Sequence, residues 1–370
     1  MSETKQHASD LISLRLDAVA RQAMDRRAFI SGLAAAGAAA AWQPGTASAA
    51  KGEVVVANWG GVAATGFQKA WGPSFEAATG LKVVIDGSGP APGKIRSMVE
   101  AKNVVWDVCD TSVGAVMQLG EAGLLEEIDY TIVDKSRLRP AFAYKWGVCN
   151  YMFSYVMVVN KKRFGSNPPR NWKDFWNVKD FPGKRMLRGS CGGQLEAALI
   201  ADGVDPKKIY PIDVKRALEK IREIKEHTIF WKTGAQSEDL VRQEEVVAGN
   251  MWSNRANLLR IEMNDAIAWP WEGAVVAPAV WLVPKGNPAG KEAAMKFINH
   301  ALEPDGQIEL FKLIGMSPSN PAAAAKIPPD LKPYDATQPD HMAVQVVLDD
   351  DWYGKNMAQV EAQYLEIISS

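Results

Sequence analysis

The chain has 370 residues and a mass of 40.4 kDa, a length that predicts two or three domains. Hydrophobic residues make up 47% and charged residues 23%, which excludes a disordered or fibrous chain. With 42 basic and 43 acidic residues the net charge is −1, so the composition does not favour nucleic acid as a partner. The 13 tryptophans are numerous, and such amphipathic rings often form binding surfaces.

The first 49 residues have the pattern of a twin-arginine export signal. Arg26 and Arg27 precede an Ala/Gly-rich apolar run that closes with Ala-Ser-Ala at 47–49. A membrane anchor is the alternative, but the run is shorter than the roughly 20 residues that span a bilayer. We therefore expect cleavage after Ala49 and, since no Cys stands at the junction, a soluble periplasmic protein without a lipid anchor.

The chain then alternates between strand and helix patterns. A β-branched run at Val54–Ala57 leads into a glycine turn at Asn58–Gly61, an apolar helix ends before Gly80, and a second strand covers Leu81–Ile85. This order predicts parallel α/β layers with right-handed crossovers. Three further elements are expected: a strand at Val104–Cys109, a helix at Val113–Ala122 and a strand at Phe153–Val159.

A Pro/Trp-rich block after Asn160 indicates the start of a second lobe. Its expected elements begin or end at clear boundary residues. Two strands are expected, at Lys184–Arg188 and, with its following loop, at Asn250–Asn254. Three helices are expected: one at Gln194–Ala201, one capped by Asp213, and one capped by Ser237 that ends at Gly249.

Enzymatic signatures are missing from the sequence. The four histidines are scattered without metal-ligand spacing, and there is no phosphate loop, nucleophile elbow or dinucleotide fingerprint. We therefore expect no metal and no cofactor. Cys191, in a glycine loop before a helix, is the best candidate nucleophile, but it lacks an evident His partner. Cys109 and Cys149 either form a disulfide or are buried free thiols.

The loop around Cys191 has a second interpretation as an anion site. The amides of Ser190, Gly192 and their neighbours open a helix, and Arg188, just upstream in the chain, could clamp a carboxylate. Arg255 is expected in another strand-end loop. The structural alternative is that both arginines are solvated and that the glycines only turn the chain.

Trp59 and Trp252 each follow a strand directly, where open α/β sheets bind ligands. Ser112 and Tyr353 are weaker candidates. Together with the anion site, these residues make up the predicted ligand-binding set: Trp59, Gly60, Ser112, Arg188, Ser190, Gly192, Trp252, Arg255 and Tyr353.

A set of ordered motifs resembles the periplasmic solute-binding proteins of ABC importers, in the branch of the spermidine/putrescine-binding proteins. The motifs are Asn58-Trp59-Gly60-Gly61, GEAGLLEEID at Gly120–Asp129, NWKDFW at Asn171–Trp176, Phe181-Pro182-Gly183-Lys184, Ala201-Asp202-Gly203-Val204 and Val283-Pro284-Lys285-Gly286. The resemblance spans nearly the whole mature chain and implies a two-lobed α/β fold of the type II, venus-flytrap kind, with a hinge of crossing strands.

The implied lobes are residues 50–158 with 279–318 and residues 159–278 with 319–370, closing on a ligand. The tryptophans that the family places in its cleft correspond to Trp59 and Trp252. The acidic residues with which the family holds ammonium groups fall on the Gly189–Gly193 loop and near Ala279, where this sequence has no Asp or Glu. A buried dication needs carboxylate partners, so the departure disfavours spermidine.

The sequence therefore predicts a non-enzymatic, monomeric receptor that captures a carboxylate-bearing solute, such as an ω-amino acid or organic acid. The resemblance implies delivery to an ABC permease and its ATPase. Polyamine binding is the alternative, with Glu196 or Asp110 holding an amine. Two interpretations from different classes of protein are a hydrolase that depends on Cys191 and a scaffold or sensor protein.

Overall fold

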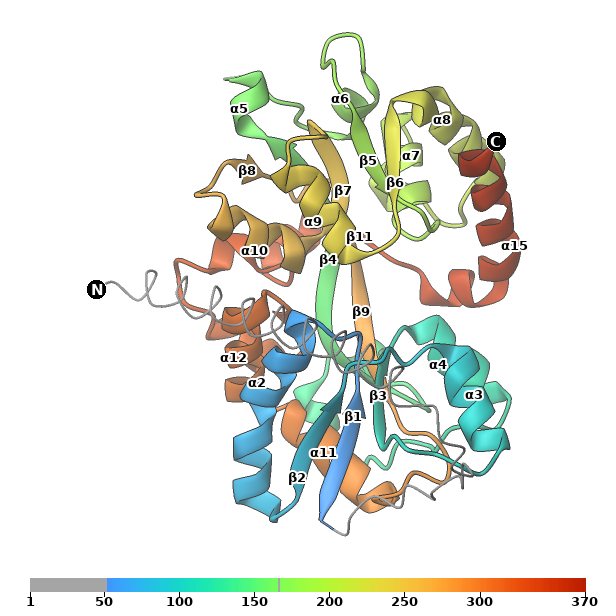
Figure 1. The fold of residues 1–370 in the computed structure, drawn as a ribbon, viewed down its shortest axis with the longest axis vertical. Helices are drawn as coiled ribbons and strands as arrows, with labels where there is room; N and C mark the ends of the chain where they lie inside the picture. The colour runs from blue at the N-terminus through green and yellow to red at the C-terminus, as the bar shows by residue number, and fades with distance from the viewer. Residues whose placement is uncertain (1–51, 166) are drawn as a thin grey trace, which may run out of the picture. The chain divides into compact units, whose positions relative to one another are not determined.

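A computed structural model describes residues 52–165 and 167–370, which form a mixed α/β structure (Figure 1). The expected export signal at 1–49 lies outside these residues. Two compact units are present, and each is described by itself. Unit 1 comprises the described residues up to Asn150 together with Val280–Ile314, and unit 2 comprises Tyr151–Ala279 and Gly315–Ser370. The lobe boundaries expected from the sequence, at 158/159, 278/279 and 318/319, stay a prediction.

Unit 1 contains β1 (Glu53–Ala57), β2 (Lys82–Asp86) and β3 (Val108–Thr111), with parts of β4 (Val148–Asn160) and β9 (Val275–Leu282). The strand order is β2-β1-β3-β9-β4, and β1 pairs in parallel with both β2 and β3. The helices of this unit are α2 (Val62–Thr79), α3 (Pro92–Glu100), α4 (Val113–Glu121), α11 (Lys291–Ala301) and α12 (Pro304–Ile314).

The predicted helix before Gly80 is confirmed, and its apolar spacing has a packing reason. Phe67 and Trp71 of α2 lie in an aromatic cluster with Trp281 of β9 and Phe297 of α11. Ring centroids are 4.9 Å apart for Phe67 and Trp71 and 5.7 Å apart for Trp71 and Trp281, in edge-on geometry. Gly80 ends the helix in the left-handed conformation (φ 73°).

The strand expected at Val104–Cys109 begins only at Val108. The preceding residues lie outside the strand. The Asp107 N–H donates to the Val55 carbonyl (2.9 Å), and side chains make further contacts with the sheet. Trp106 donates its indole N–H to Asp86 of β2 (2.6 Å), and the Asp107 carboxylate accepts the backbone N–H groups of Val55 and Ala289 (both 2.7 Å). The β-branched pattern of the sequence did not indicate that side-chain contacts precede the strand here.

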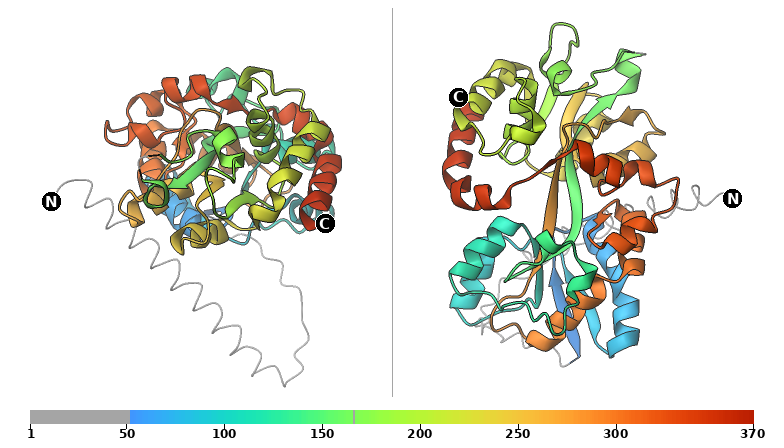
Figure 2. Two further views of the ribbon diagram at one scale, coloured as in Figure 1. Left: turned by 90° about the horizontal axis from the view of Figure 1, so that it is seen from above. Right: turned by 180° about the vertical axis from the view of Figure 1, so that it is seen from behind.

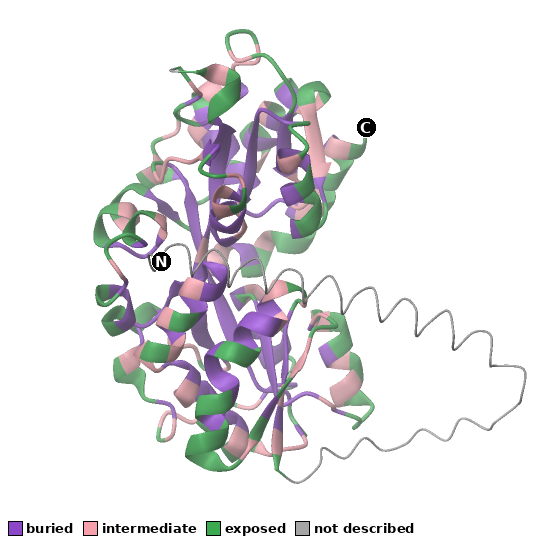
Figure 3. Cartoon of the chain, turned by 60° about the vertical axis from the view of Figure 1, so that its left-hand side comes forward, coloured by how far each residue is buried: buried purple, intermediate pink, exposed green. Residues whose placement is uncertain are grey.

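Unit 2 is built around β5 (Arg185–Arg188), β6 (Thr228–Trp231), β7 (Ala248–Trp252) and the remaining part of β4, in the order β4-β7-β5-β6. Pairing is parallel for β5 with β6 and with β7, and antiparallel for β4 with β7. The burial colours of Figure 3 correspond to mostly buried strands β4, β5 and β7, whereas only Trp231 of β6 is buried. The short strands are β8 (Ile267–Ala268), β10 (Ser317–Pro318) and β11 (Val346–Val347).

The helices of unit 2 are α5 (Lys161–Phe164), α6 (Trp172–Trp176), α7 (Gln194–Ala201), α8 (Val214–Ile224), α9 (Gly234–Arg242), α10 (Ser253–Glu262), α13 (Pro321–Ala325), α14 (Pro339–Val344) and α15 (Asp350–Ser369). Figure 2 shows α15 from two further sides, and it packs against α8. In the described part of the chain no helix is long and apolar enough to cross a membrane.

Two expectations for unit 2 are confirmed and two are wrong. Asp213 caps α8 by accepting the Arg216 N–H, and α7 has its predicted bounds. Ser237 is not a cap: it is buried within α9 and donates to the Gly234 carbonyl, while Thr233 caps the helix. The helix also ends at Arg242 instead of Gly249, because Glu244 adopts a left-handed conformation (φ 57°) and Gly249 belongs to β7.

The three cysteines are fully buried and none forms a disulfide in the described structure, which decides between the alternatives for Cys109 and Cys149. Cys109 lies on β3 and Cys149 on β4, and β9 runs between these two strands. Two strand spacings amount to roughly 10 Å, beyond the roughly 7 Å that a disulfide spans between Cα atoms. The strand order therefore keeps the two thiols apart.

Glu196 is a buried carboxyl group in unit 2, on α7. It accepts hydrogen bonds from the phenol of Tyr210 (2.6 Å) and from the phenol of Tyr353 on α15 (3.0 and 3.1 Å). Burial raises the pKa of this carboxyl above the free value of 4.5, although the hydrogen bonds oppose the shift. The group stabilises the fold most when it is protonated.

We expect native protein to expose no thiol to a disulfide reagent and to release three thiols on unfolding. All three side chains have no exposed surface, so the reagent must wait for opening of the fold. Titration with Ellman's reagent, with and without guanidinium, measures this. Only one thiol after non-reductive unfolding would show that two cysteines form a disulfide.

Glu196→Gln should change how stability depends on pH. The wild-type contribution of Glu196 is complete below pH 4.5 and is lost as pH rises through the raised folded pKa, whereas Gln stays neutral and still accepts from the tyrosines. The variant should therefore gain stability over wild type as pH rises from 4.5 to 8, by roughly 1.4 kcal/mol for each unit of pKa shift. Urea unfolding at several pH values measures it, with Glu219→Gln on the exposed face of α8 as control. If the difference in unfolding free energy between Glu196→Gln and wild type did not depend on pH, the raised pKa of Glu196 would be contradicted.

Candidate functional site

Three strands of unit 2 end at the same edge of the sheet with a large or charged side chain. Arg188, Trp231 and Trp252 are the last residues of β5, β6 and β7. Arg188 pairs in register with Trp231, and Tyr155 of β4 pairs with Trp252. Because parallel strands bring their carboxyl ends to one edge, the pairing gathers these four residues.

The Arg188 guanidinium lies among aromatic rings and has no carboxylate partner in the described chain. Its Nη1 donates to the phenol oxygen of Tyr155 (2.9 Å), and its central carbon lies 5.3 Å from the Trp252 ring centroid and 6.0 Å from that of Trp231. Arg188 is half-buried, and no ion pair to it forms among residues 52–165 and 167–370. It is therefore a partly desolvated cation able to take an anion.

Two neutral donors near this edge also lack acceptors. The indole Nε1 of Trp252 and the amide Nδ2 of Asn250 are buried without a hydrogen-bond partner in the described chain. Asn250 accepts from Gln194, whose side chain in turn accepts the Arg188 backbone N–H. Unpaired donors next to an unpaired cation make an environment suited to a negatively charged or acceptor-rich group.

The expected strand-end loop around Arg255 is absent. Trp252 is followed directly by α10, so Arg255 lies in the first turn of that helix. Its Nη1 donates to the Glu238 carboxylate at 2.8 Å, while its central carbon lies 5.8 Å from the Trp252 ring centroid. The structure thus brings both arginines to one tryptophan, but Arg255 is already neutralised by a neighbouring helix.

The amides proposed as an anion site are partly occupied by the protein itself. The Glu361 carboxylate of α15 accepts the Cys191 N–H (2.8 Å) and the Ser190 hydroxyl (3.3 Å). Gly192 is buried, and the next residue, Gly193, has φ 79° and faces the Tyr155 ring so closely that a Cβ would lie 2.5 Å from it. Glu361 was missed because no local sequence signal links it to a loop 170 residues away.

Two weaker candidates have internal structural roles. Tyr353 is 4% exposed and donates to buried Glu196. Ser112 caps α4 by accepting the Ala115 N–H, at 3.4 Å. Glu196, the candidate partner for an amine, is enclosed by its two tyrosines.

Unit 1 carries the other nominated tryptophan, in the turn after β1. Trp59 is 57% exposed, a large fraction for an indole. Gly60 beside it has φ 71°, donates its N–H to the Asn58 side chain, and lies so close to Gly87 that a Cβ would come within 2.6 Å of the Gly87 carbonyl oxygen. The glycine turn therefore presents the Trp59 ring to solvent on a fixed backbone.

Cys191 is poorly suited to nucleophilic catalysis. Its side chain is buried beside the Met357 sulfur. Burial, chiefly, and the Glu361 carboxylate raise the pKa of the thiol, so the reactive thiolate is disfavoured at neutral pH. Within the described residues no three His, Cys, Asp or Glu side chains gather as metal ligands.

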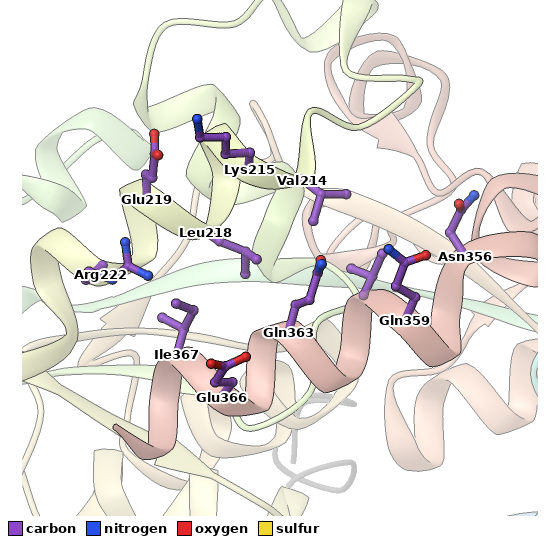
Figure 4. Close-up of a pocket in the computed structure, with 11 residues that line it drawn as sticks. Val214, Lys215, Leu218, Glu219, Arg222, Asn356, Gln359, Gln363, Glu366 and Ile367 are labelled. Atoms are coloured by element: carbon purple, nitrogen blue, oxygen red, sulfur yellow. The ribbon is translucent and has the colours of Figure 1, made fainter.

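A groove of about 530 Å³ lies between α8 and α15 of unit 2 (Figure 4). Its lining is mixed, with Leu218 and Ile367 among charged and amide side chains such as Arg222 and Gln363. None of the nominated ligand-binding residues lines it.

The family model for bacterial extracellular solute-binding proteins matches residues 70–338. The gamma-aminobutyric acid-binding protein of Pseudomonas aeruginosa is 30% identical over 278 residues, covering 73% of this chain and 78% of that protein. The Escherichia coli spermidine/putrescine-binding periplasmic protein is 22% identical over 271 residues, covering 71% and 77%.

Solved structures agree with the sequence matches. The Atu4243–GABA receptor has a TM-score of 0.79 and 32% identity over 85% of this chain and 97% of that one. The periplasmic binding protein AgtB of Agrobacterium tumefaciens R10, in complex with agropinic acid, has a TM-score of 0.76 and 31% identity over 87% and 100%. The expected two-lobed α/β fold is confirmed. The chain belongs to the bacterial extracellular solute-binding protein family and is a substrate-binding component of an ABC transporter.

Proposed function

We propose that this protein captures a small carboxylate-bearing solute, an ω-amino acid or organic acid, for ABC import, and that Arg188 binds the carboxylate. The observation that carries the proposal is the unpaired guanidinium of Arg188 among Tyr155, Trp231 and Trp252. A partly buried cation without a counterion costs free energy, and a ligand carboxylate that accepts two of its N–H groups offsets that cost.

The aromatic rings around Arg188 serve the same ligand. They lower the local dielectric, which strengthens a carboxylate–guanidinium contact, and the free Nε1 of Trp252 adds a donor. Trp252 also offers a ring face to the aliphatic part or the amine of a solute. Trp59 of unit 1, exposed on its glycine turn, stays nominated as a second ligand contact.

Related proteins support this ligand class. The P. aeruginosa relative is named for gamma-aminobutyric acid, an ω-amino acid, and AgtB was solved with agropinic acid. Polyamines are the less favoured alternative, although the E. coli relative is named for them. A polyamine needs a carboxylate for each of its ammonium groups. This edge carries the Arg188 cation, while Glu196 is enclosed by tyrosines and Glu238 pairs with Arg255.

The rest of the proposal concerns the cellular setting. Export by the twin-arginine signal would place the receptor in the periplasm as a monomer, where it delivers the solute to permease and ATPase subunits. We propose no enzymatic activity, and the buried Cys191 supports this. The lobe boundaries predicted from the sequence belong to the same proposal.

Arg188→Ala should abolish binding of γ-aminobutyrate and glutarate. Differential scanning fluorimetry with γ-aminobutyrate, glutarate and putrescine measures this, because a ligand at 100 times its Kd stabilises the protein by about 2.7 kcal/mol. Wild type should respond to one or both acids. Arg188→Lys should keep part of the response, since it retains the charge but loses the two-pronged donor geometry.

Arg222→Ala, on α8 in the groove of Figure 4, is the matched control and should respond as wild type does. A wild-type protein stabilised by putrescine alone would contradict the carboxylate assignment. An unchanged acid response in Arg188→Ala would move the site elsewhere.

A further inference from the structure

The C-terminal helix α15 holds the loop that begins at Arg188. Tyr364 donates its phenol O–H to the Arg188 carbonyl (2.5 Å), and Glu361, one turn earlier, accepts from Cys191 N and Ser190 Oγ. All of these residues belong to unit 2. Figure 1 shows α15 beside α7 and α8 of that unit. A helix 170 residues further along the chain thus determines the loop next to the proposed carboxylate site.

Glu361 brings a negative charge to this loop that no cation neutralises among the described residues. In that part of the chain it forms no ion pair, and neither does Arg188. Both residues are half-buried, so neither is fully enclosed by the described chain. Burial chiefly raises the pKa of the Tyr364 phenol, Glu361 raises it further and Arg188 lowers it, so the two charges act on the same group.

Arg188 at the end of β5 and Glu361 on α15 therefore bring opposite charges to one short loop, and no ion pair joins them. A zwitterion complements them, with its carboxylate on Arg188 and its ammonium group toward Glu361. A dicarboxylate of the same length would place its second carboxylate toward Glu361, and like charges brought together in a partly desolvated site repel.

We propose that Glu361 is a specificity-determining residue, which makes this receptor prefer ω-amino acids to dicarboxylates of matched length. The proposal rests on the proposed function, because it requires Arg188 to bind the first carboxylate. It narrows the ligand class from carboxylate-bearing solutes in general to those with an amine at the far end. The loop contributes to specificity by holding Glu361 in place, through the Cys191 N–H and the Ser190 hydroxyl, and it does not contact the ligand's carboxylate.

Two ligands separate a charge effect from a loss of loop structure. γ-Aminobutyrate and glutarate share three methylene groups and one carboxylate and differ in the other end, an ammonium or a second carboxylate. Glu361→Gln removes the charge but keeps a carbonyl oxygen that can accept the Cys191 N–H. Isothermal titration of both ligands gives the ratio of their affinities in each variant.

We expect wild type to bind γ-aminobutyrate more tightly than glutarate, and Glu361→Gln to lower this ratio about tenfold. Glu361→Asp keeps the charge and should retain most of the preference even if both affinities fall. Glu366→Gln removes the same charge from an exposed position on α15 and should leave the ratio unchanged.

Each contrary outcome has a definite meaning. If both affinities fall in parallel in Glu361→Gln, Glu361 only holds the loop and the specificity proposal is overturned. If wild type prefers glutarate, the specificity proposal fails while the carboxylate assignment stands. If wild type binds neither acid, the proposed function fails and the specificity proposal fails with it.

Discussion

The proposed ligand-binding edge of unit 2 depends on the parallel pairing of β5 with its neighbours β6 and β7. These three strands end at Arg188, Trp231 and Trp252, and parallel alignment places their ends together. Antiparallel β4 adds Tyr155 opposite Trp252. Because β4, β5 and β7 are mostly buried, their register is set by packing, and the positions of the cation and the aromatic rings follow from it.

Charge compensation divides the polar residues of this unit into two groups. Arg255 with Glu238, and Glu196 with its two tyrosines, satisfy each other inside the protein. Arg188 has no carboxylate partner, and the indole N–H of Trp252 has no acceptor, among the described residues. Buried polar groups are normally paired, so an unpaired set at a strand edge is evidence of a ligand site, whereas the paired set is evidence of structure.

The C-terminal helix has a larger part in the site than its position in the chain indicates. Tyr353, Glu361 and Tyr364 of α15 contact α7 and the loop before it. The helix dipole and the amides at 190–193 would suit a ligand anion, but Glu361 supplies an internal anion at the same place. In the proposed function the carboxylate of the solute is thereby left to the Arg188 guanidinium, and Glu361 adds a negative charge beside the loop.

The sequence by itself determined the α/β class and most strands and helices, and it placed Trp59 and Trp252 next to strand ends. Hydrophobic periodicity and glycine turns are local signals, so one sequence is enough to detect them. It also singled out Arg188. Only the tertiary structure decided that Arg255 lies on a helix and pairs with Glu238, that Tyr353 is buried against Glu196, and that Glu361 occupies the loop amides. It likewise showed that β9 separates Cys109 from Cys149. These features depend on contacts between residues far apart in the chain, for which one sequence carries no periodic pattern.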